Sequence, residues 1–224
     1  MSQLYLNKNL RSKLKSQIKM FCDYFITHLF PTFDNIEQTA YKYANDVYAA
    51  LMKQFAGPDE DGSSVADTAI EHGLNHYTAL ASIRYSFSAL ALASLYHLWE
   101  QQAREFLFNE LSRDQHIPPD KFCPNGLEGI KEIFLKYGVD LTTFKSWSQL
   151  NELRIICNVV KHGDGKSANE LRGLKPKLFN PDVYRSTTSS LFEDILLVSS
   201  KEFVEYADML IAFWDEIPEH DICP

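Results

Sequence analysis

The chain has 224 residues, a hydrophobic content of 45% and a formal net charge of −8. This length suits one domain, and the hydrophobic content is enough for a sizeable core. The negative charge argues against a protein that coats nucleic acid without specificity, although it leaves room for a local basic patch. The 4 cysteines are widely spaced with no CxxC pair. This spacing favours reduced thiols in the cytoplasm over a disulfide framework or a zinc site.

No stretch of the sequence predicts a membrane protein. The first residues, MSQLYLNKNLRSKLKSQ, lack the apolar centre of a signal peptide. The longest apolar stretch, near residues 89–99, is interrupted by Ser94 and His97 and is too short to cross a bilayer. We therefore expect a cytoplasmic protein that makes no contact with a membrane.

The first part of the chain predicts two helices. Residues 5–30 form an amphipathic pattern with a basic start, and Pro31 should stop this helix. Asp34 can cap the beginning of a second helix over residues 35–55. Residues 57–64, GPDEDGSS, predict a loop. This loop does not match a calcium-binding loop, because its glycine is misplaced and no glutamate stands at the twelfth position.

A long helix is predicted over residues 65–111, with a bend near Gly73. Its middle is rich in alanine and serine, which allows a neighbouring helix to approach closely, so we expect this helix to be the central strut. Polar residues near its end, Glu100, Gln101 or Glu105, could meet the polar face of another helix.

Two histidines of this long helix, His72 and His76, have the spacing of a zinc-binding HExxH motif. Gly73 stands where that motif requires glutamate, so two exposed histidines are favoured over a metal site. We therefore expect neither a metal nor a cofactor.

The last third of the chain predicts three further helices around a central one. Residues 127–137 form a short helix that Gly138 should end. Ser167 and Glu170 have the spacing of a capping box, which predicts a helix that ends by Pro176. Ser199 and Glu202 form a second capping box, before a final helix over 201–214.

The sequence as a whole predicts an all-α helical bundle. Residues 112–125 contain three prolines and should connect two helices. Residues 180–198 predict a long loop, in which a small hairpin remains an alternative. No repeat divides the chain, so residues 1–224 are expected to form one helical domain.

The strongest helical pattern covers residues 147–162. Apolar residues cover most of its circumference, so the helix should be largely buried. Gly163 and Gly165 should end it. One narrow polar arc remains, made of Trp147, Asn151, Arg154, Asn158, Lys161 and His162. It is either a solvated face with basic residues near the helix end, or a functional site.

The segment after this helix, GDGKS at 163–167, suggests a phosphate-binding loop. Val160 stands where the Walker A pattern requires glycine, and a helix precedes the segment in place of a strand. Both features argue against a nucleotide-binding loop. Exposed amides at the start of the next helix, beside Lys166, could still hold a phosphate. An ordinary turn capped by Ser167 is the favoured alternative.

Positive charge is concentrated from residue 154 to residue 177, although the chain as a whole is acidic. The basic residues there are Arg154, Lys161, Lys166, Arg172, Lys175 and Lys177, against Asp164 and Glu170. Cys157 lies at the edge of the apolar face, which favours an inert packed thiol over a nucleophile.

The pattern W-x(5)-LR-x(3)-N-x(3)-H over residues 147–162, followed by glycines, resembles the HEPN superfamily. The pattern NxxKHGxG with a later serine and Pro-x-Leu-Phe resembles an uncharacterised subgroup of it. HEPN domains are small all-α domains of toxin–antitoxin, abortive-infection and other antiviral systems. Many carry arginine, a polar residue and a histidine in this order. On this chain Asn158 and His162 match the last two, whereas Cys157 occupies the position of the arginine.

The resemblance implies a homodimer that cleaves RNA without a metal, with the paired motifs in one cleft. In that case His162 would transfer a proton, Lys161 or Arg154 would stabilise the phosphate, and Asn158 would orient either group. Lys166, Ser167 and Arg172 would bind RNA phosphates. The alternative is an inactive HEPN-like module that binds RNA, a nucleotide or a partner protein from the same operon. A purely structural helical protein is the third possibility.

Overall fold

The computed structural model describes residues 4–54, 62–112, 118, 122, 125–163, 165–179 and 196–219. Over these residues the predicted all-α class is confirmed. The described β-structure is limited to isolated bridges between Leu6 and Glu219 and between Phe179 and Leu196. The elements, in chain order, are α1 (Lys8–Tyr24), a π-turn η1 (Phe25–Leu29), 3₁₀ turn η2 (Phe30–Phe33), α2 (Ile36–Gln54), α3 (Gly62–Ser112), α4 (Gly126–Lys136), η4 (Leu141–Thr143), α5 (Trp147–His162), α6 (Lys166–Leu174), η5 (Pro176–Leu178) and α7 (Ser200–Glu216).

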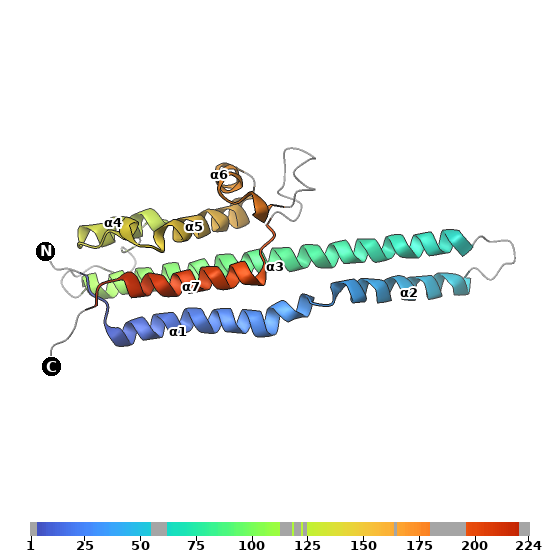
Figure 1. Ribbon diagram of the computed structural model, residues 1–224, viewed down its shortest axis with the longest axis horizontal. Helices are drawn as coiled ribbons and strands as arrows, with labels where there is room; N and C mark the ends of the chain where they lie inside the picture. Colours follow the sequence, from blue (N-terminus) through green and yellow to red (C-terminus); the bar gives the residue numbers. More distant parts are fainter. Residues whose placement is uncertain are drawn as a thin grey trace.

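The molecule is elongated because α3 runs along its whole length (Figure 1). Around the C-terminal half of α3 lie α1, α4, α5 and α7, which together form what we call the body. The N-terminal part of α3 extends away from the body with only α2 beside it. We call this pair, α2 and residues 62–80 of α3, the arm. The predicted central strut is confirmed, since α3 packs against α1, α2, α4, α5 and α7.

The core of the body is aromatic. Trp99 of α3 and Phe213 of α7 meet edge to face with ring centroids 5.1 Å apart, and Phe106 and Phe134 add further rings. The buried Gln102 ties three helices together. Its amide nitrogen donates to the Leu14 carbonyl at 3.1 Å and to Gln17 at 2.9 Å, and its oxygen accepts from the Trp214 indole at 3.1 Å.

The first helix is shorter than predicted. It ends at Tyr24, and the chain continues through the π-turn Phe25–Leu29 and the 3₁₀ turn Phe30–Phe33 before α2 begins. Pro31 is the physical cause, because it lacks the N–H that the helical ladder would need and its ring crowds the preceding turn. The predicted acidic loop lies mostly in 55–61, outside the described residues, but Gly62–Ser64 already belong to α3.

One of the two predicted capping boxes is wrong. α6 begins at Lys166 with Gly165 as its N-cap, so Ser167 lies inside the first turn and cannot cap it. The Gly165 carbonyl accepts from the Asn169 amide at 3.1 Å, which starts the helix before Ser167. The second box is confirmed. The Ser199 hydroxyl accepts from the Glu202 amide at 3.2 Å, and the Glu202 carboxylate accepts from the Ser199 amide at 2.9 Å.

Two other regions bear on the predictions. Most of the predicted loop, residues 180–195, lies outside the described residues, and the chain on either side is joined by the Leu197 amide donating to the Leu178 carbonyl at 2.7 Å.

Among the described residues, α3 is long and apolar enough to cross a membrane, with a mean hydropathy of 1.2 over 18 residues that are 28% buried. That is weak evidence, because the core helix of a soluble protein passes the same test.

Candidate functional site

The helix that carries the candidate site, α5, is held at both ends. At its start, the Glu216 carboxylate of α7 accepts from the backbone amides of Lys145 at 2.5 Å and Ser146 at 3.0 Å. This carboxylate lies where the helix dipole favours a negative charge. At its end, Gly163 has φ of 68° and donates its amide to the Val159 carbonyl at 2.7 Å. The predicted limits of α5 and its glycine stop are therefore confirmed.

The predicted apolar face of α5 is buried. Its buried residues are Leu150, Leu153, Ile155, Ile156 and Val159. They pack against α3 and α7 and fix the rotation of α5 about its own axis. The orientation of the polar arc therefore follows from the burial of these side chains.

The polar arc divides into a half-buried row and an exposed end. Asn151, Arg154 and Asn158 are half-buried, whereas Lys161 and His162 are exposed. The Arg154 Nε donates to the Asn151 side chain at 3.0 Å, which fixes the arginine along the helix. Arg154, Asn158 and His162 follow one another at intervals of four residues, so they lie on neighbouring turns of one face.

The long helix α3 brings an acidic residue to the opposite edge of this row. Glu100 is 14% exposed at its side chain and pairs with Arg104 at 3.2 Å and with the His97 Nδ1 at 3.6 Å. Burial, and then the charges of Glu100 and Cys157, raise the pKa of the nearby Tyr96 hydroxyl. Of the three polar residues that could meet another helix, Glu100 lies close enough to Cys157 of α5 for its charge to act on that thiol, while Gln101 and Glu105 are exposed.

The thiol of Cys157 is protonated at neutral pH. Burial raises its pKa far above the ordinary range, and the negative charge of Glu100 raises it further. A protonated thiol is a poor nucleophile. The expectation of an inert packed thiol is therefore supported at the one position where the HEPN pattern would place an arginine.

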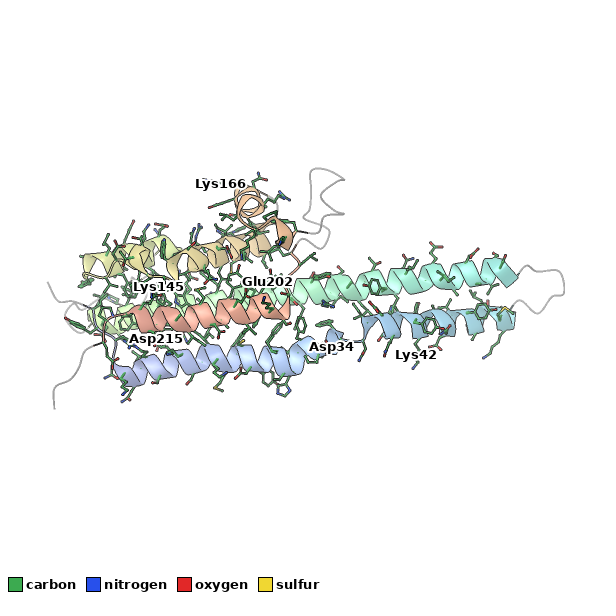
Figure 2. The ribbon with its side chains drawn as sticks, viewed as in Figure 1. Asp34, Lys42, Lys145, Lys166, Glu202 and Asp215 are labelled. Carbon is green, nitrogen blue, oxygen red and sulfur yellow. The ribbon has the colours of Figure 1, made fainter. Side chains whose placement is uncertain are left out.

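The turn between α5 and α6 carries three exposed basic side chains. Lys161 and His162 end α5, and Lys166 begins α6 on the outer side of the molecule (Figure 2). Asp164, in the middle of this turn, lies outside the described residues. Among the residues that the structure describes, no side chain caps the first amides of α6. Amides in this position can hold an anion.

The other two predicted phosphate-binding residues lie further along α6. Ser167 is half-buried in the first turn of α6. Arg172 lies toward the far end of α6, where it donates to Asn169 at 3.1 Å and its guanidinium lies 4.9 Å from the centroid of the Phe179 ring. The structure therefore brings Lys161, His162 and Lys166 to one turn, but it engages Arg172 with Phe179.

A second polar cluster beside the site was not predicted. The Glu152 carboxylate of α5 accepts a hydrogen bond from the buried Tyr206 hydroxyl of α7 and lies 3.3 Å from the Lys175 Nζ. Burial, and then the hydrogen bond with Glu152, raise the pKa of Tyr206. These contacts tie α5 to α7 and to the end of α6. The three residues are distant in sequence, so no local pattern could have revealed them.

The described residues thus define an all-α protein with a basic turn at the end of a buried, clamped helix. A comparison of the chain with protein-family models, curated protein sequences and solved structures found no match.

Proposed function

We propose that the chain is a HEPN-like protein of a defence or toxin–antitoxin type system, and that it cleaves RNA without a metal by using His162. The observation that supports this proposal best is the exposure of His162 between Lys161 and Lys166, at the turn where α5 ends and α6 begins. Phosphate is the natural ligand of such a turn, because cations and the amides at a helix N-terminus meet there.

The proposed reaction needs one proton removed and one proton supplied. The ribose 2′-oxygen loses its proton and attacks the phosphorus, the bond to the 5′-oxygen breaks, and that oxygen gains a proton. An imidazole can both accept and donate a proton, so His162 suits either transfer. Lys161 and Lys166 would hold the phosphate, and Asn158 would orient His162 from one turn earlier.

A non-catalytic RNA-binding module is the second candidate, and Cys157 favours it. A protonated, half-buried thiol supplies no positive charge at the position of the HEPN arginine. Losing one such donor costs about 3 kcal/mol of transition-state stabilisation in comparable sites. Arg154 lies one turn earlier on α5, where its Nε donates to Asn151. A module of this kind would keep the phosphate contacts of Lys161 and Lys166 but would not turn over RNA.

The first experiment measures cleavage. Single-stranded RNA and tRNA are incubated in EDTA with the wild-type chain, His162→Ala and the matched control His28→Ala, which removes an exposed histidine from η1. We expect the wild type and the control to cut, and His162→Ala to be slower by about 10² to 10⁴. Intact RNA with all three proteins would reject the nuclease. Equal cutting by all three would show that His162 has no part in it.

The second experiment measures binding, so that the module survives if the nuclease fails. Fluorescence anisotropy of a labelled RNA is compared for the wild type, the double variant Lys161→Ala with Lys166→Ala, and the control Lys42→Ala on the exposed face of α2. The double variant should bind more weakly, and its salt dependence should fall by about one to two counterions. An equal loss in Lys42→Ala would mean that the binding is unspecific and would reject both candidates.

A third variant separates the two candidates further. Cys157→Arg restores the HEPN arginine beside Glu100, which can pair with it. If the chain is a module that lost its activity, this variant should gain metal-independent cleavage that His162→Ala removes again. Unchanged cleavage in Cys157→Arg, combined with loss of cleavage in His162→Ala, would exclude the inactive module.

A further inference from the structure

One face of the arm exposes large apolar side chains. Tyr41 is 72% exposed, Leu74 is 62% exposed and Ile70 is 57% exposed. Tyr48 and Tyr77 are also exposed, and together these side chains border a groove of about 420 Å³ between α2 and α3. A contiguous apolar surface of this kind usually marks an interaction site.

The groove has a low floor made of small residues. Ala40 and Ala44 of α2 face Ala69 and Gly73 of α3, and the tyrosines and leucine rise on either side. A Cβ on Gly73 would lie 2.7 Å from the Ala44 Cβ, so the two backbones are as close as side chains permit. Ridges of another helical layer can therefore enter between the raised side chains.

The exposed stripe on α3 continues a stripe that is buried in the body. The exposed part consists of Ile70, Leu74 and Tyr77, and the buried part ends with Trp99, Gln102 and Phe106. Steps of three and four residues join the two parts through positions 81, 84, 88, 92 and 95. In the body this stripe is covered, with α7 packed on Trp99 and on the last two residues. In the arm the same face of α3 has no covering helix among the described residues (Figure 1).

The exposed face is nearly symmetric along the arm. On α2, Tyr41 and Tyr48 stand on either side of Ala44 and Asn45. On α3, Ile70 and Leu74 stand at equal distances from position 72. The close approach of Ala44 and Gly73 fixes the register of the two antiparallel helices, so position 72 lies opposite Asn45. This arrangement suits a two-fold interface, because each residue pair across such an interface occurs twice.

We propose that the arm is a homodimer interface, in which the arm of a second copy packs antiparallel on this face to complete a four-helix bundle. Tyr41 then meets Tyr48 of the second copy, and Ile70 meets Leu74 of the second copy. The proposal goes beyond the proposed RNA chemistry and does not depend on it.

The available area is sufficient for such an interface. With its 19 residues, α2 is about 28 Å long, and two adjacent helices are about 20 Å wide. One copy therefore contributes roughly 570 Å², and two copies bury roughly 1,100 Å², which exceeds the about 1,000 Å² that a specific interface needs.

A membrane is a less suitable occupant of this face. The arm carries Asp67 and Glu71 on α3, and Glu37 and Asn45 border the groove itself. Burial of such groups in hydrocarbon would cost several kcal/mol, whereas a second protein surface leaves its edges in water.

The antiparallel dimer would keep the two candidate sites apart. Tyr96, which lies near Cys157, is about 36 Å along α3 from the level of the proposed axis. The turn after His162 lies about 7 Å nearer to the arm, because α5 runs in that direction (Figure 1), so the two sites would be roughly 60 Å apart. Each turn with Lys161, His162 and Lys166 would then act alone. This differs from the single shared cleft that the HEPN resemblance implies.

The oligomeric state tests the proposal directly. Sedimentation velocity of the full chain at micromolar concentration should show a dimer. Leu74→Asp and Tyr41→Lys should each raise the dissociation constant by at least about tenfold, because each places a charge at the centre of the contact. The matched control Leu135→Asp changes a leucine that is 56% exposed on α4 and should leave the dimer intact. Circular dichroism checks that each variant is folded. Because Tyr41 is largely exposed, Tyr41→Lys should fold even if Leu74→Asp does not, so the proposal can still be tested.

A monomeric wild type overturns the proposal, and so does a dimer that both arm variants leave unchanged or that the control also dissociates. Flotation with phosphatidylcholine vesicles tests whether lipid occupies this face instead. If the wild type floats and Leu74→Asp does not, the face binds lipid and the proposal fails.

Cross-linking tests the antiparallel register. Asn45→Cys should form a disulfide-linked dimer under mild oxidation, because the two copies of position 45 lie beside the two-fold axis. Gln54→Cys, at the tip of α2, should not, because its two copies would be about 28 Å apart. The wild type under the same oxidant is the control for the native cysteines. Cross-linking through position 54 and not through position 45 would reject this arrangement.

Discussion

The Cα of Gly73 on α3 faces Ala44 on α2 so closely that a methyl group on Gly73 would lie 2.7 Å from the Ala44 Cβ. This contact sets the spacing of the two helices of the arm. It also explains a glycine in the interior of a long helix, where glycine costs about 1 kcal/mol relative to alanine.

Gly73→Ala should therefore destabilise the chain despite the better helix propensity of alanine. Overpacking costs about 1 to 3 kcal/mol, which exceeds the roughly 1 kcal/mol that propensity returns. Gly173→Ala is the matched control, because a Cβ there meets nothing within 4 Å. It should be neutral or slightly stabilising. Urea unfolding of both variants checks this, and a more stable Gly73→Ala would contradict the close contact.

Ser199→Ala should lower the free energy of unfolding by about 1 kcal/mol, because it removes the capping side chain of α7. Ser167→Ala should have little effect on stability, since Ser167 does not cap α6. The comparison of their melting temperatures tests the assignment of the two caps. Equal losses in both variants would restore the capping role that the sequence pattern suggested for Ser167.

Gln102→Leu should destabilise the body by about 2 kcal/mol. Leucine has a similar size, but it leaves the buried indole N–H of Trp214 without its acceptor. Gln101→Leu, at the exposed neighbouring position, should change stability by less than about 0.5 kcal/mol. Chemical denaturation distinguishes the two, and a neutral Gln102→Leu would show that the network contributes nothing.

Stability should fall at alkaline pH. The pKa values of Cys157, Tyr96 and Tyr206 are all raised in the folded chain, chiefly by burial. The unfolded chain releases these protons near the ordinary pKa values of about 8.5 and 10, while the folded chain retains them. Their contribution is therefore complete below about pH 8 and is lost as the pH rises above that range.

Tyr206→Phe isolates one of these groups. The variant should lose about 1 kcal/mol at neutral pH, because the hydrogen bond to Glu152 is gone. Its stability should then decline less steeply than that of the wild type above about pH 9. Melting temperatures measured across the alkaline range provide the check. Parallel curves for the two proteins would indicate that Tyr206 titrates normally.

Local patterns predicted the helices whose ends have clear chemical causes. Gly163 ends α5 and Ser199 begins α7, as expected, because each residue acts through its immediate neighbours. The predicted cap at Ser167 was wrong, because Gly165 is the N-cap of α6 and the helix begins before Ser167. The spacing of Ser167 and Glu170 does not reveal this. The π-turn before Pro31 was missed for a similar reason, since a proline limits a helix without specifying how the preceding turn reorganises.

The candidate site was only partly visible in the sequence. The helical period was enough to place Arg154, Asn158 and His162 on one face of α5. It could not show that Glu100 borders Cys157 or that Glu216 clamps the start of α5, because these contacts join helices that are distant in the chain. It also could not show that Arg172 lies on Phe179, away from the turn.

The continuity of α3 gives the molecule a mechanical property. Its 51 residues form one unbroken helix, with about 50 Å between Tyr96, beside α5, and Gly62 at the tip of the arm. A tilt of about 5° at the body would therefore displace that tip by about 4 Å, because the helix is a stiff rod of this length. In this respect α3 is a lever, with its short end among the helices of the body and its long end in the arm.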